Sequence, residues 1–243
     1  MLVTYGVGLL AYVALALGRL ERLPPTSDLL WAALAGLCGM LGVGFLFRGF
    51  AIGRMGIVAP VSAVFATIIP VVFAAVTSGL PKELQLAGFG LALVSIWLIS
   101  RRERLGAARP AGLVMALLAG LGFGGFFTAL GQVGDSAVFW PLAAARLSAC
   151  LVMLAFALFT RRSVIPPLGP LRMLLLAGVL DAAGNVFFLL AIQSGRLDVA
   201  AVLGSLYPGV TAILAWLISG ERMVRLQVVG VAVAILAIIL ITL

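Results

Sequence analysis

The 243-residue sequence contains no histidine, only eight acidic residues and only two cysteines. Histidine is the commonest metal ligand and a frequent general base, so its absence argues against the usual catalytic and metal-binding clusters. Cys38 and Cys150 lie far apart, each inside an apolar run, and predict neither a disulfide framework nor a metal site. We therefore expect no cofactor and no bound metal.

Charged residues are also scarce, at 10% of the chain, whereas hydrophobic residues make up 64%. Soluble domains carry about 25% charged and about 45–50% apolar residues, so this composition predicts an integral membrane protein. The net charge of +8 does not indicate nucleic-acid binding. The arginines lie in short bursts between apolar runs, as in residues 101–109 and 160–162, where membrane proteins keep their cytoplasmic basic residues.

Nine apolar runs are separated by glycine, proline or charge, and a membrane-spanning helix needs roughly 20 apolar residues. They predict an all-α polytopic membrane protein with short connections. The first run contains an A-x-A motif at Ala14–Ala16 but follows no basic residue, which favours a membrane helix over a signal peptide. The expected helices cover residues 2–18, 29–51, 57–78, 84–100, 111–133, 137–160, 170–193, 198–218 and 224–243.

An internal repeat becomes visible when the chain is shifted by 142 residues. Polar and glycine positions then coincide, which is better evidence than matches between apolar residues alone. The shift predicts two copies of one unit, at residues 1–101 and 110–243. The coinciding positions are Gly53-Arg54 with Gly195-Arg196, Leu84-Gln85 with Leu226-Gln227, Gly88 with Gly230, Ala92 with Ala234 and Ile96 with Ile238.

The two expected copies differ in length, because the second holds five helices and the first holds four. Shifting the second copy back places the partner of its opening helix before Met1. We therefore expect the opening helix of the first copy to be absent from this sequence. Copies with an odd number of helices lie in opposite orientations across the membrane, an arrangement common in secondary transporters with a central site.

Glycines and prolines mark where helices are expected to pack closely or to bend. The stretches GLCGMLGVG (36–44) and GLGFGG (120–125) place glycines three and four residues apart, a spacing that lets membrane helices approach each other. Pro60, Pro70 and Pro208 fall inside expected helices and predict kinks or breaks. Carbonyl groups freed at such breaks are tolerated where they line a cavity.

Residues 197–240 closely resemble the last two helices of EamA-like members of the drug/metabolite transporter superfamily. Residues 177–195 are similar to the preceding helix of that family, and residues 45–64, which include Arg48 and Pro60, are similar to a helix pair of its first half. The resemblance covers nearly the whole chain. Its C-terminal motif consists of Ser205-Leu206-Tyr207-Pro208, Thr211, Gly220-Glu221-Arg222 and Gln227 before Gly230.

This resemblance implies ten helices in two inverted bundles of five, with a substrate cavity between the bundles and no bound cofactor. Family members carry amino acids, other small metabolites or toxic compounds, frequently outward. The present sequence departs from the family pattern in two places. The opening helix is absent, and Gly79 is followed by Leu80 where the second copy has a glutamate after its glycine.

Asp181 is the most conspicuous candidate for a functional residue, because it lies in the middle of an apolar run. An aspartate at a helix centre costs about 2.5–3.5 kcal/mol to insert, so such residues usually face a cavity or a partner. A desolvated carboxyl group also binds its proton more tightly, which suits proton coupling. Asn185 follows one turn later on the same face. The alternative is a structural hydrogen bond to Asn185 or a salt bridge to Arg146.

Arg146 is expected near mid-membrane in the sixth helix, where its planar guanidinium suits an anionic substrate group or a pairing with Asp181. Near a helix end it would instead snorkel to the interface. Trp140, Tyr207 and Gln193 are also expected to line the cavity. Trp140 fits an interfacial belt equally well, and Gln193 fits a helix end. Arg48 joins these candidates through the family resemblance.

Two criteria disagree on the orientation of the chain. Most basic residues outside the helices follow the second, fourth, sixth and eighth expected helices. The positive-inside rule then places Met1 in the cytoplasm and the C-terminus outside. The family resemblance implies a cytoplasmic C-terminus, so both orientations stay open.

These features predict a secondary active transporter or exporter of small organic metabolites, amino-acid-like or drug-like, in a bacterial inner membrane. It would work by alternating access with proton coupling at Asp181, as a monomer or homodimer surrounded by lipid. A non-transporting fragment or assembly partner is the alternative, because a helix is absent. A membrane enzyme acting on lipid-linked substrates would need clustered histidine or acidic residues, which the sequence lacks, so we do not expect an enzyme.

Overall fold

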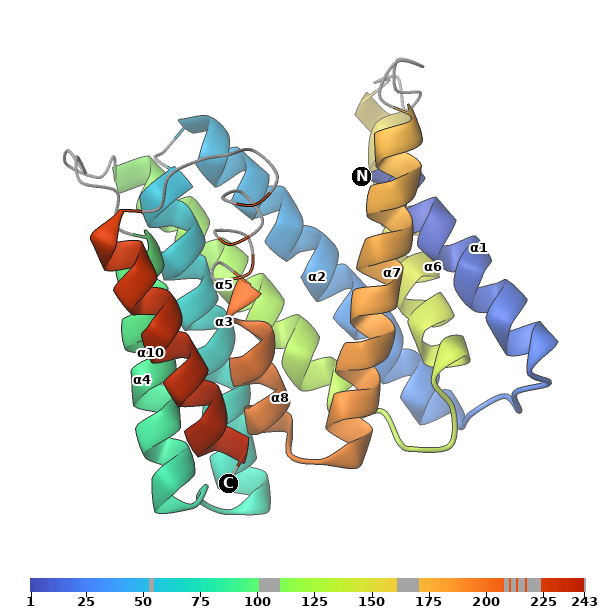
Figure 1. Cartoon of the computed structure of the whole chain (residues 1–243). Helices are drawn as coiled ribbons and strands as arrows, with labels where there is room; N and C mark the ends of the chain where they lie inside the picture. Colours follow the sequence, from blue (N-terminus) through green and yellow to red (C-terminus); the bar gives the residue numbers. More distant parts are fainter. Residues whose placement is uncertain are drawn as a thin grey trace. The chain divides into compact units, whose positions relative to one another are not determined.

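The computed structural model describes residues 1–52, 55–100, 110–160, 171–207, 210, 213, 217 and 224–242 (Figure 1). All regular elements in these ranges are α-helices, and no strand occurs among them. The helices are α1 (Leu2–Gly18), α2 (Thr26–Ile52), α3 (Met55–Ser78), α4 (Glu83–Ser100), α5 (Pro110–Leu130), α6 (Phe139–Thr160), α7 (Leu171–Ser194), α8 (Leu197–Gly204) and α10 (Arg225–Thr242).

Five of these helices, α2, α3, α5, α6 and α7, contain segments long and apolar enough to cross a membrane. α1, α4 and α10 are also apolar but shorter. Large apolar side chains remain exposed along them, as at Leu10, Val76 and Phe159, which suits contact with lipid better than contact with water. The predicted class, an all-α integral membrane protein, is confirmed in these respects.

The observed helix ends differ from the expected ones by no more than three residues, except at the eighth helix. α8 ends at Gly204, whereas a helix to residue 218 was expected; Ser205 and Leu206 form a turn, and Tyr207, Val210, Ile213 and Leu217 are again helical. The sequence supplies a reason, because Pro208 has no N–H to donate to the Gly204 carbonyl and its ring clashes there. Pro208 itself lies outside the described residues. α3 runs without a break through Pro60 and Pro70, so of the predicted kinks or breaks no break occurs there.

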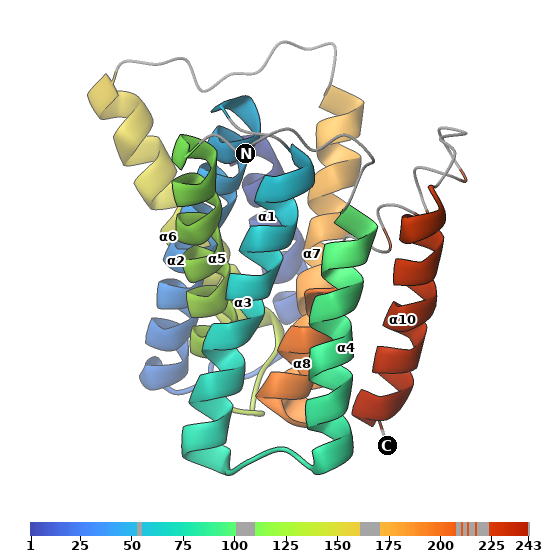
Figure 2. The same cartoon turned by 90° about the vertical axis from the view of Figure 1, so that its left-hand side faces the viewer.

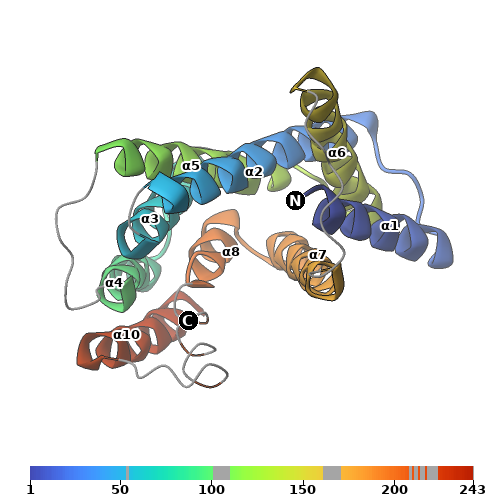
Figure 3. The same cartoon turned by 90° about the horizontal axis from the view of Figure 1, so that it is seen from above.

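Two compact units are distinguished by their internal contacts. Unit 1 comprises Met1–Met40 and Thr128–Gly195, and unit 2 comprises Leu41–Phe127 and Arg196–Leu243. Each unit contains segments from both expected copies of the repeat. The boundaries of the two units therefore differ from those of the two copies. In unit 1, α1 lies between α6 and α7 (Figure 3).

Glycines let the helices of unit 1 approach closely. A Cβ atom at Gly36 on α2 would lie 1.9 Å from the carbonyl oxygen of Ala145 on α6. A Cβ atom at Gly178 on α7 would lie 3.0 Å from the carbonyl oxygen of Thr4 on α1. Only a residue without a side chain fits at Gly36, and these two contacts set the register of α2 on α6 and of α7 on α1.

In unit 2, α4 and α10 run side by side in opposite directions (Figure 2). Gln85, near the start of α4, donates through Nε2 to the carbonyl of Ile241 at the end of α10, at 3.4 Å. Gln227, near the start of α10, donates through Nε2 to the carbonyl of Ile99 at the end of α4, at 3.1 Å. One glutamine therefore joins the two helices at each end of the pair.

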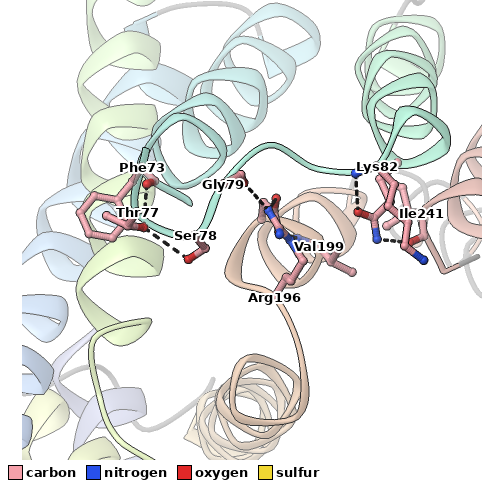
Figure 4. Close-up of polar contacts among 10 residues, drawn as sticks. Phe73, Thr77, Ser78, Gly79, Lys82, Arg196, Val199 and Ile241 are labelled. Atoms are coloured by element: carbon pink, nitrogen blue, oxygen red, sulfur yellow. Dashed lines mark hydrogen bonds and ion pairs between the residues drawn. The ribbon is translucent and has the colours of Figure 1, made fainter. Parts of the chain in front are cut away.

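Both glutamines also cap their own helices. The backbone N–H of Lys82 donates to Oε1 of Gln85 at 3.2 Å (Figure 4), and that of Val224 donates to Oε1 of Gln227 at 3.1 Å. The first N–H groups of a helix have no partner within the helix, and a glutamine in the first turn can satisfy one of them. Each side chain thus serves its own helix with the oxygen and the neighbouring helix with the nitrogen.

These features repeat under the shift of 142 residues. Gln85 falls on Gln227, and Ile99 falls on Ile241. The shift therefore relates the bond between Gln85 and Ile241 to the bond between Gln227 and Ile99. Helix boundaries repeat as well: the ends of α1 and α2 fall on the ends of α6 and α7, and the starts of α3 and α4 fall on the starts of α8 and α10. These helix limits and local contacts thus coincide under the same shift that aligns the predicted copies.

Replacing either glutamine by alanine removes both of its hydrogen bonds. We expect Gln85→Ala and Gln227→Ala each to lower the free energy of unfolding by about 1–3 kcal/mol, because each variant loses two hydrogen bonds and one such bond usually contributes about 0.5–1.5 kcal/mol. The two losses should be similar, because the surroundings are reciprocal. Gln132→Ala is the matched control, since Gln132 makes only a 3.5 Å contact with the Thr128 carbonyl. Thermal melts in one detergent compare the three, and losses no larger than the control's would contradict the role.

Candidate functional site

An ion pair joins α6 and α7 in unit 1. The guanidinium of Arg146 donates through Nη2 to Oδ2 of Asp181. The Arg146 side chain is only 9% exposed, whereas that of Asp181 is 51% exposed. Asn185 donates through Nδ2 to the backbone carbonyl of Asp181 at 2.7 Å, one turn along the same helix. The structure therefore brings together three of the predicted residues, with the cation enclosed and the carboxylate accessible.

α1 supplies two tyrosines to the same place. The guanidinium carbon of Arg146 lies 4.3 Å from the ring centroid of Tyr5, a cation–π contact. The hydroxyl of Tyr12 donates to the Ala182 carbonyl of α7 at 2.9 Å. Between them, Gly8 leaves room for the arginine, because a Cβ atom there would lie 3.3 Å from Arg146 Nε.

The sequence analysis missed Tyr5 and Tyr12. They lie seven residues apart with Gly8 between them, so all three share one face of α1. That spacing of two of the three tyrosines of the chain was an available signal. On an apolar helix, however, aromatic residues at helical spacing usually belong to ordinary packing, and the sequence does not show which helix faces them.

The ion pair can act on small polar molecules in a specific way. A buried guanidinium offers a fixed, planar set of donors that matches a carboxylate or another anionic group. The accessible carboxylate beside it accepts hydrogen bonds or a proton. The rings of Tyr5 and Tyr12 are buried, at 8 and 1% exposure, and help to enclose the site on the α1 side. The cluster of Tyr5, Tyr12, Arg146, Asp181 and Asn185 is hereafter called the α1–α6–α7 site.

Trp140 and Gln193 lie elsewhere in unit 1. At about 1.5 Å of rise per residue, Trp140 is roughly 9 Å along α6 from Arg146, and Gln193 is roughly 18 Å along α7 from Asp181. Gln193 donates through Nε2 to the carbonyls of Gly134 and Ala137, at 3.0 and 3.1 Å. Gln193 therefore contacts the loop that precedes α6, close to the end of its own helix.

Glu21 anchors the start of α6. Its carboxylate accepts the backbone N–H groups of Val138, Phe139 and Trp140 at 2.8 to 3.2 Å. The indole of Trp140 donates back to the Glu21 carbonyl at 2.9 Å. A negative charge at a helix start satisfies unpaired N–H groups and meets the positive end of the helix dipole. Trp140 therefore positions α6 at its start.

We expect Glu21→Ala to lower the free energy of unfolding by about 1–2 kcal/mol, the usual cost of losing a helix cap. The cost comes from three backbone N–H groups that lose their acceptor. Glu83→Ala is the matched control, because Glu83 lies exposed in the first turn of α4. Thermal melts of the two variants make the comparison, and equal melting temperatures would exclude the capping role.

Tyr207 and Arg48 belong to unit 2. The hydroxyl of Tyr207 donates to the Ala59 carbonyl of α3 at 3.4 Å. Arg48 is exposed on α2. Within the described residues, the seven predicted candidates therefore divide into three at the ion pair, two near the start of α6 and two in unit 2.

A second ion pair, which the sequence analysis did not predict, lies in unit 2. Arg196 precedes α8, and its guanidinium donates to both carboxylate oxygens of Asp198, at 2.8 and 3.0 Å, and to the Gly79 carbonyl at 3.0 Å (Figure 4). Hydrogen bonding to Asp198 raises the pKa of the Arg196 guanidinium. Asp198 is fully buried. These bonds tie the start of α8 to the loop after α3, which is a structural role.

The comparison with protein families decides the identity of the chain. The profile of the EamA-like transporter family matches residues 110–243, more than half of the sequence. The chain belongs to the EamA-like transporter family. This EamA-like protein is accordingly a membrane transporter of small molecules, as the resemblance in the sequence had implied.

No curated protein matches this EamA-like chain in sequence. Among solved structures, one titled only "Crystal structure of protein" is similar with a TM-score of 0.77 and 17% sequence identity. The match covers 99% of the present chain and 85% of the other. At this level of identity, the similarity concerns the fold alone.

Proposed function

We propose that this EamA-like protein is a secondary active transporter of small organic metabolites in a bacterial inner membrane, with the α1–α6–α7 site as its binding and coupling site. Membership of the family supports a membrane transporter of small molecules. The observation that carries the finer proposal is the pairing of a buried Arg146 with a half-exposed Asp181 between membrane helices. Intramembrane ionisable residues of this kind usually mark substrate or ion pathways.

The pair offers a simple means of coupling. Protonation of Asp181 removes the negative charge that faces Arg146, so the guanidinium becomes available to an anionic group of the substrate. Loss of the proton restores the carboxylate, which then competes with that group for the same donors. Proton binding and substrate binding at Arg146 are therefore linked through one pair of side chains.

We also propose that residues 1–101 and 110–243 are two inverted copies of one unit, which alternate access by moving against each other. The antiparallel direction of α4 and α10, and their reciprocal glutamine bonds, support this arrangement. The helices that coincide under the shift also contact each other in pairs, α1 with α6, α3 with α8 and α4 with α10. Contacts between equivalent helices are expected near a two-fold axis.

The test uses purified protein in proteoliposomes. A thermal-shift screen against amino acids and other small metabolites first selects a ligand, whose flux is then followed under an imposed pH gradient. We expect the gradient to drive flux of the wild type and not of Asp181→Asn, because an amide cannot exchange the proton. Asp135→Asn, which changes an exposed loop aspartate, is the matched control and should retain the wild-type response. Gradient-driven flux through Asp181→Asn at the wild-type rate would remove proton coupling from this residue.

A further inference from the structure

The end of α1, the start of α2, the loop before α6 and the end of α7 meet at one end of unit 1 (Figure 1). Asp28, in the first turn of α2, is only 8% exposed, and its carboxylate accepts the backbone N–H of Gly134 at 3.2 Å. Glu21 accepts the N–H groups of residues 138–140, as described above. Glu21 and Asp28, with the N–H groups that they accept, are hereafter called the clamp.

The clamp joins the two predicted copies of the repeat. Glu21 and Asp28 belong to the first copy, whereas the loop and α6 belong to the second. Gln193 also holds the loop, but Gln193 itself lies in the second copy. If one copy moves away from the other at this end, the bonds of Glu21 and Asp28 must break, and those of Gln193 need not.

The opposite end of unit 1 is built differently. The end of α6 and the start of α7 lie apart there, both in the side view and from above (Figure 2 and Figure 3). Apolar side chains are exposed at this end, at 69% for Leu158, 90% for Phe159 and 77% for Met173. The ion pair of Arg146 and Asp181 lies between the two ends, and the Asp181 side chain is half-exposed. Within unit 1, carboxylates thus fasten one end, and the helices diverge toward the other.

The sequence gives the clamp to one copy only. Under the shift of 142 residues, the counterparts of Glu21 and Asp28 are Ser163 and Pro170, and neither carries a carboxylate. Inverted copies place equivalent residues at opposite faces of the membrane. In the proposed arrangement, the clamp therefore distinguishes one face of the membrane from the other.

We infer that the clamp is the gate that closes the α1–α6–α7 site toward one face of the membrane, and that it opens when the site turns to that face. This inference rests on the proposed alternating access and names the contacts that control it. Near its start, α1 lies close to α7 where Gly178 faces Thr4, so α1 can tilt about this point while the clamp at its other end separates. Bonds between carboxylates and backbone N–H groups suit a gate, because water replaces both partners when they part and the net cost is small.

Cys150 serves as the reporter in a test that needs no known substrate. It is partly buried and lies one turn beyond Arg146 on the same face of α6. Cys38 is the only other cysteine, so Cys38→Ser leaves a single thiol near the ion pair. The labelling rate of Cys150 with a membrane-impermeant maleimide is measured from each face, in spheroplasts and in everted inner-membrane vesicles. Ser136→Cys, exposed in the loop, shows in a chain without the native cysteines which face carries the clamp.

We expect Cys150 to be labelled faster from the face opposite the clamp. Glu21→Ala/Asp28→Ala should raise the rate from the clamp face roughly 5- to 30-fold, the change in population that corresponds to the usual cost of a lost helix cap. The rate from the opposite face should fall, because alternating access does not open both faces together. Gln193→Ala is the matched control. It also loses two bonds to the loop, but within one copy, and should leave both rates unchanged.

A disulfide across the clamp should have the reverse effect. A Cβ atom at Gly134 would lie 3.9 Å from Cγ of Asp28, so the cysteines of Asp28→Cys/Gly134→Cys are close enough to be joined by oxidation. We expect the oxidised form to be labelled at Cys150 only from the opposite face, and reduction to restore labelling from the clamp face. Peptide mass spectrometry separates Cys150 from the added cysteines. This variant decides the question if Glu21→Ala/Asp28→Ala is not recovered folded.

Three results would overturn the inference. They are faster labelling of the wild-type Cys150 from the clamp face, equal effects of Glu21→Ala/Asp28→Ala and Gln193→Ala, and labelling from the clamp face that persists in the oxidised disulfide variant. Failure of the proposed function has a different signature. It would appear as an absence of gradient-driven flux in proteoliposomes while the labelling pattern of Cys150 follows the expectation.

Discussion

Gly36→Ala is expected to lower the free energy of unfolding by about 3 kcal/mol or more, at the upper end of the range for overpacked cores. The added Cβ atom would lie 1.9 Å from the carbonyl oxygen and 2.6 Å from the carbonyl carbon of Ala145. Both are backbone atoms, so no side-chain rotation relieves the overlap. α2 and α6 must move apart, which also strains the 2.8 Å bond from the Ser148 hydroxyl to the Ala33 carbonyl.

Gly44→Ala is the matched control for this prediction, because Gly44 lies on the same helix with no atom within 4 Å of an added Cβ. Alanine is the better helix former by about 1 kcal/mol, so the control should melt at or above the wild-type temperature. Thermal melts and the yield of monodisperse protein in detergent measure both variants. A Gly36→Ala variant as stable as Gly44→Ala would mean that α2 and α6 do not pack at this distance.

The second large effect is an asymmetry within the ion pair. We expect Asp181→Asn to destabilise the protein more than Arg146→Met, although each change breaks the same contact. Asp181→Asn leaves a guanidinium that is only 9% exposed without its counter-charge. Removing one partner of a fully buried pair costs about 3–5 kcal/mol, and the 51% exposure of Asp181 reduces our expectation to about 1–3 kcal/mol.

Arg146→Met keeps most of the side-chain volume and leaves a half-exposed aspartate, which solvent and Asn185, whose Nδ2 lies 3.5 Å from Asp181 Oδ1, can still satisfy. The double variant Arg146→Met/Asp181→Asn should therefore recover most of the loss of Asp181→Asn. A double-mutant cycle of melting temperatures measures this coupling. Strictly additive effects would show that the two side chains do not depend on each other in the folded protein.

The positions of the helices were largely predictable from the sequence, because each spanning helix needs a long apolar run and the runs are separated by glycine, proline or charge. The exact end of α8 was not predictable, because the apolar run continues past Gly204. Pro208 predicted a kink or break in this helix, since it has no N–H to donate to the Gly204 carbonyl, and a turn does occur at Ser205 and Leu206.

The candidate site was predictable only in part. Arg146 and Asp181 could be found because charges are rare inside apolar runs. Their pairing could not be decided, because it depends on the register of α7 and α6 against α1, which contacts such as that of Gly178 determine. The bond of the Trp140 indole to the Glu21 carbonyl could not be predicted for a related reason, because no pattern in the sequence joins residues so far apart in the chain.

The glutamine bonds at the two ends of the α4–α10 pair bear on the energy balance of the proposed transport cycle. Chemically identical groups hold the pair at both of its ends, so in the proposed inverted arrangement opening it toward one compartment costs about as much as toward the other. A preference for the inward or the outward form must then come from features that occur in one copy only. Arg146 and Asp181 are such features, because their counterparts under the shift are Thr4 and Gly39.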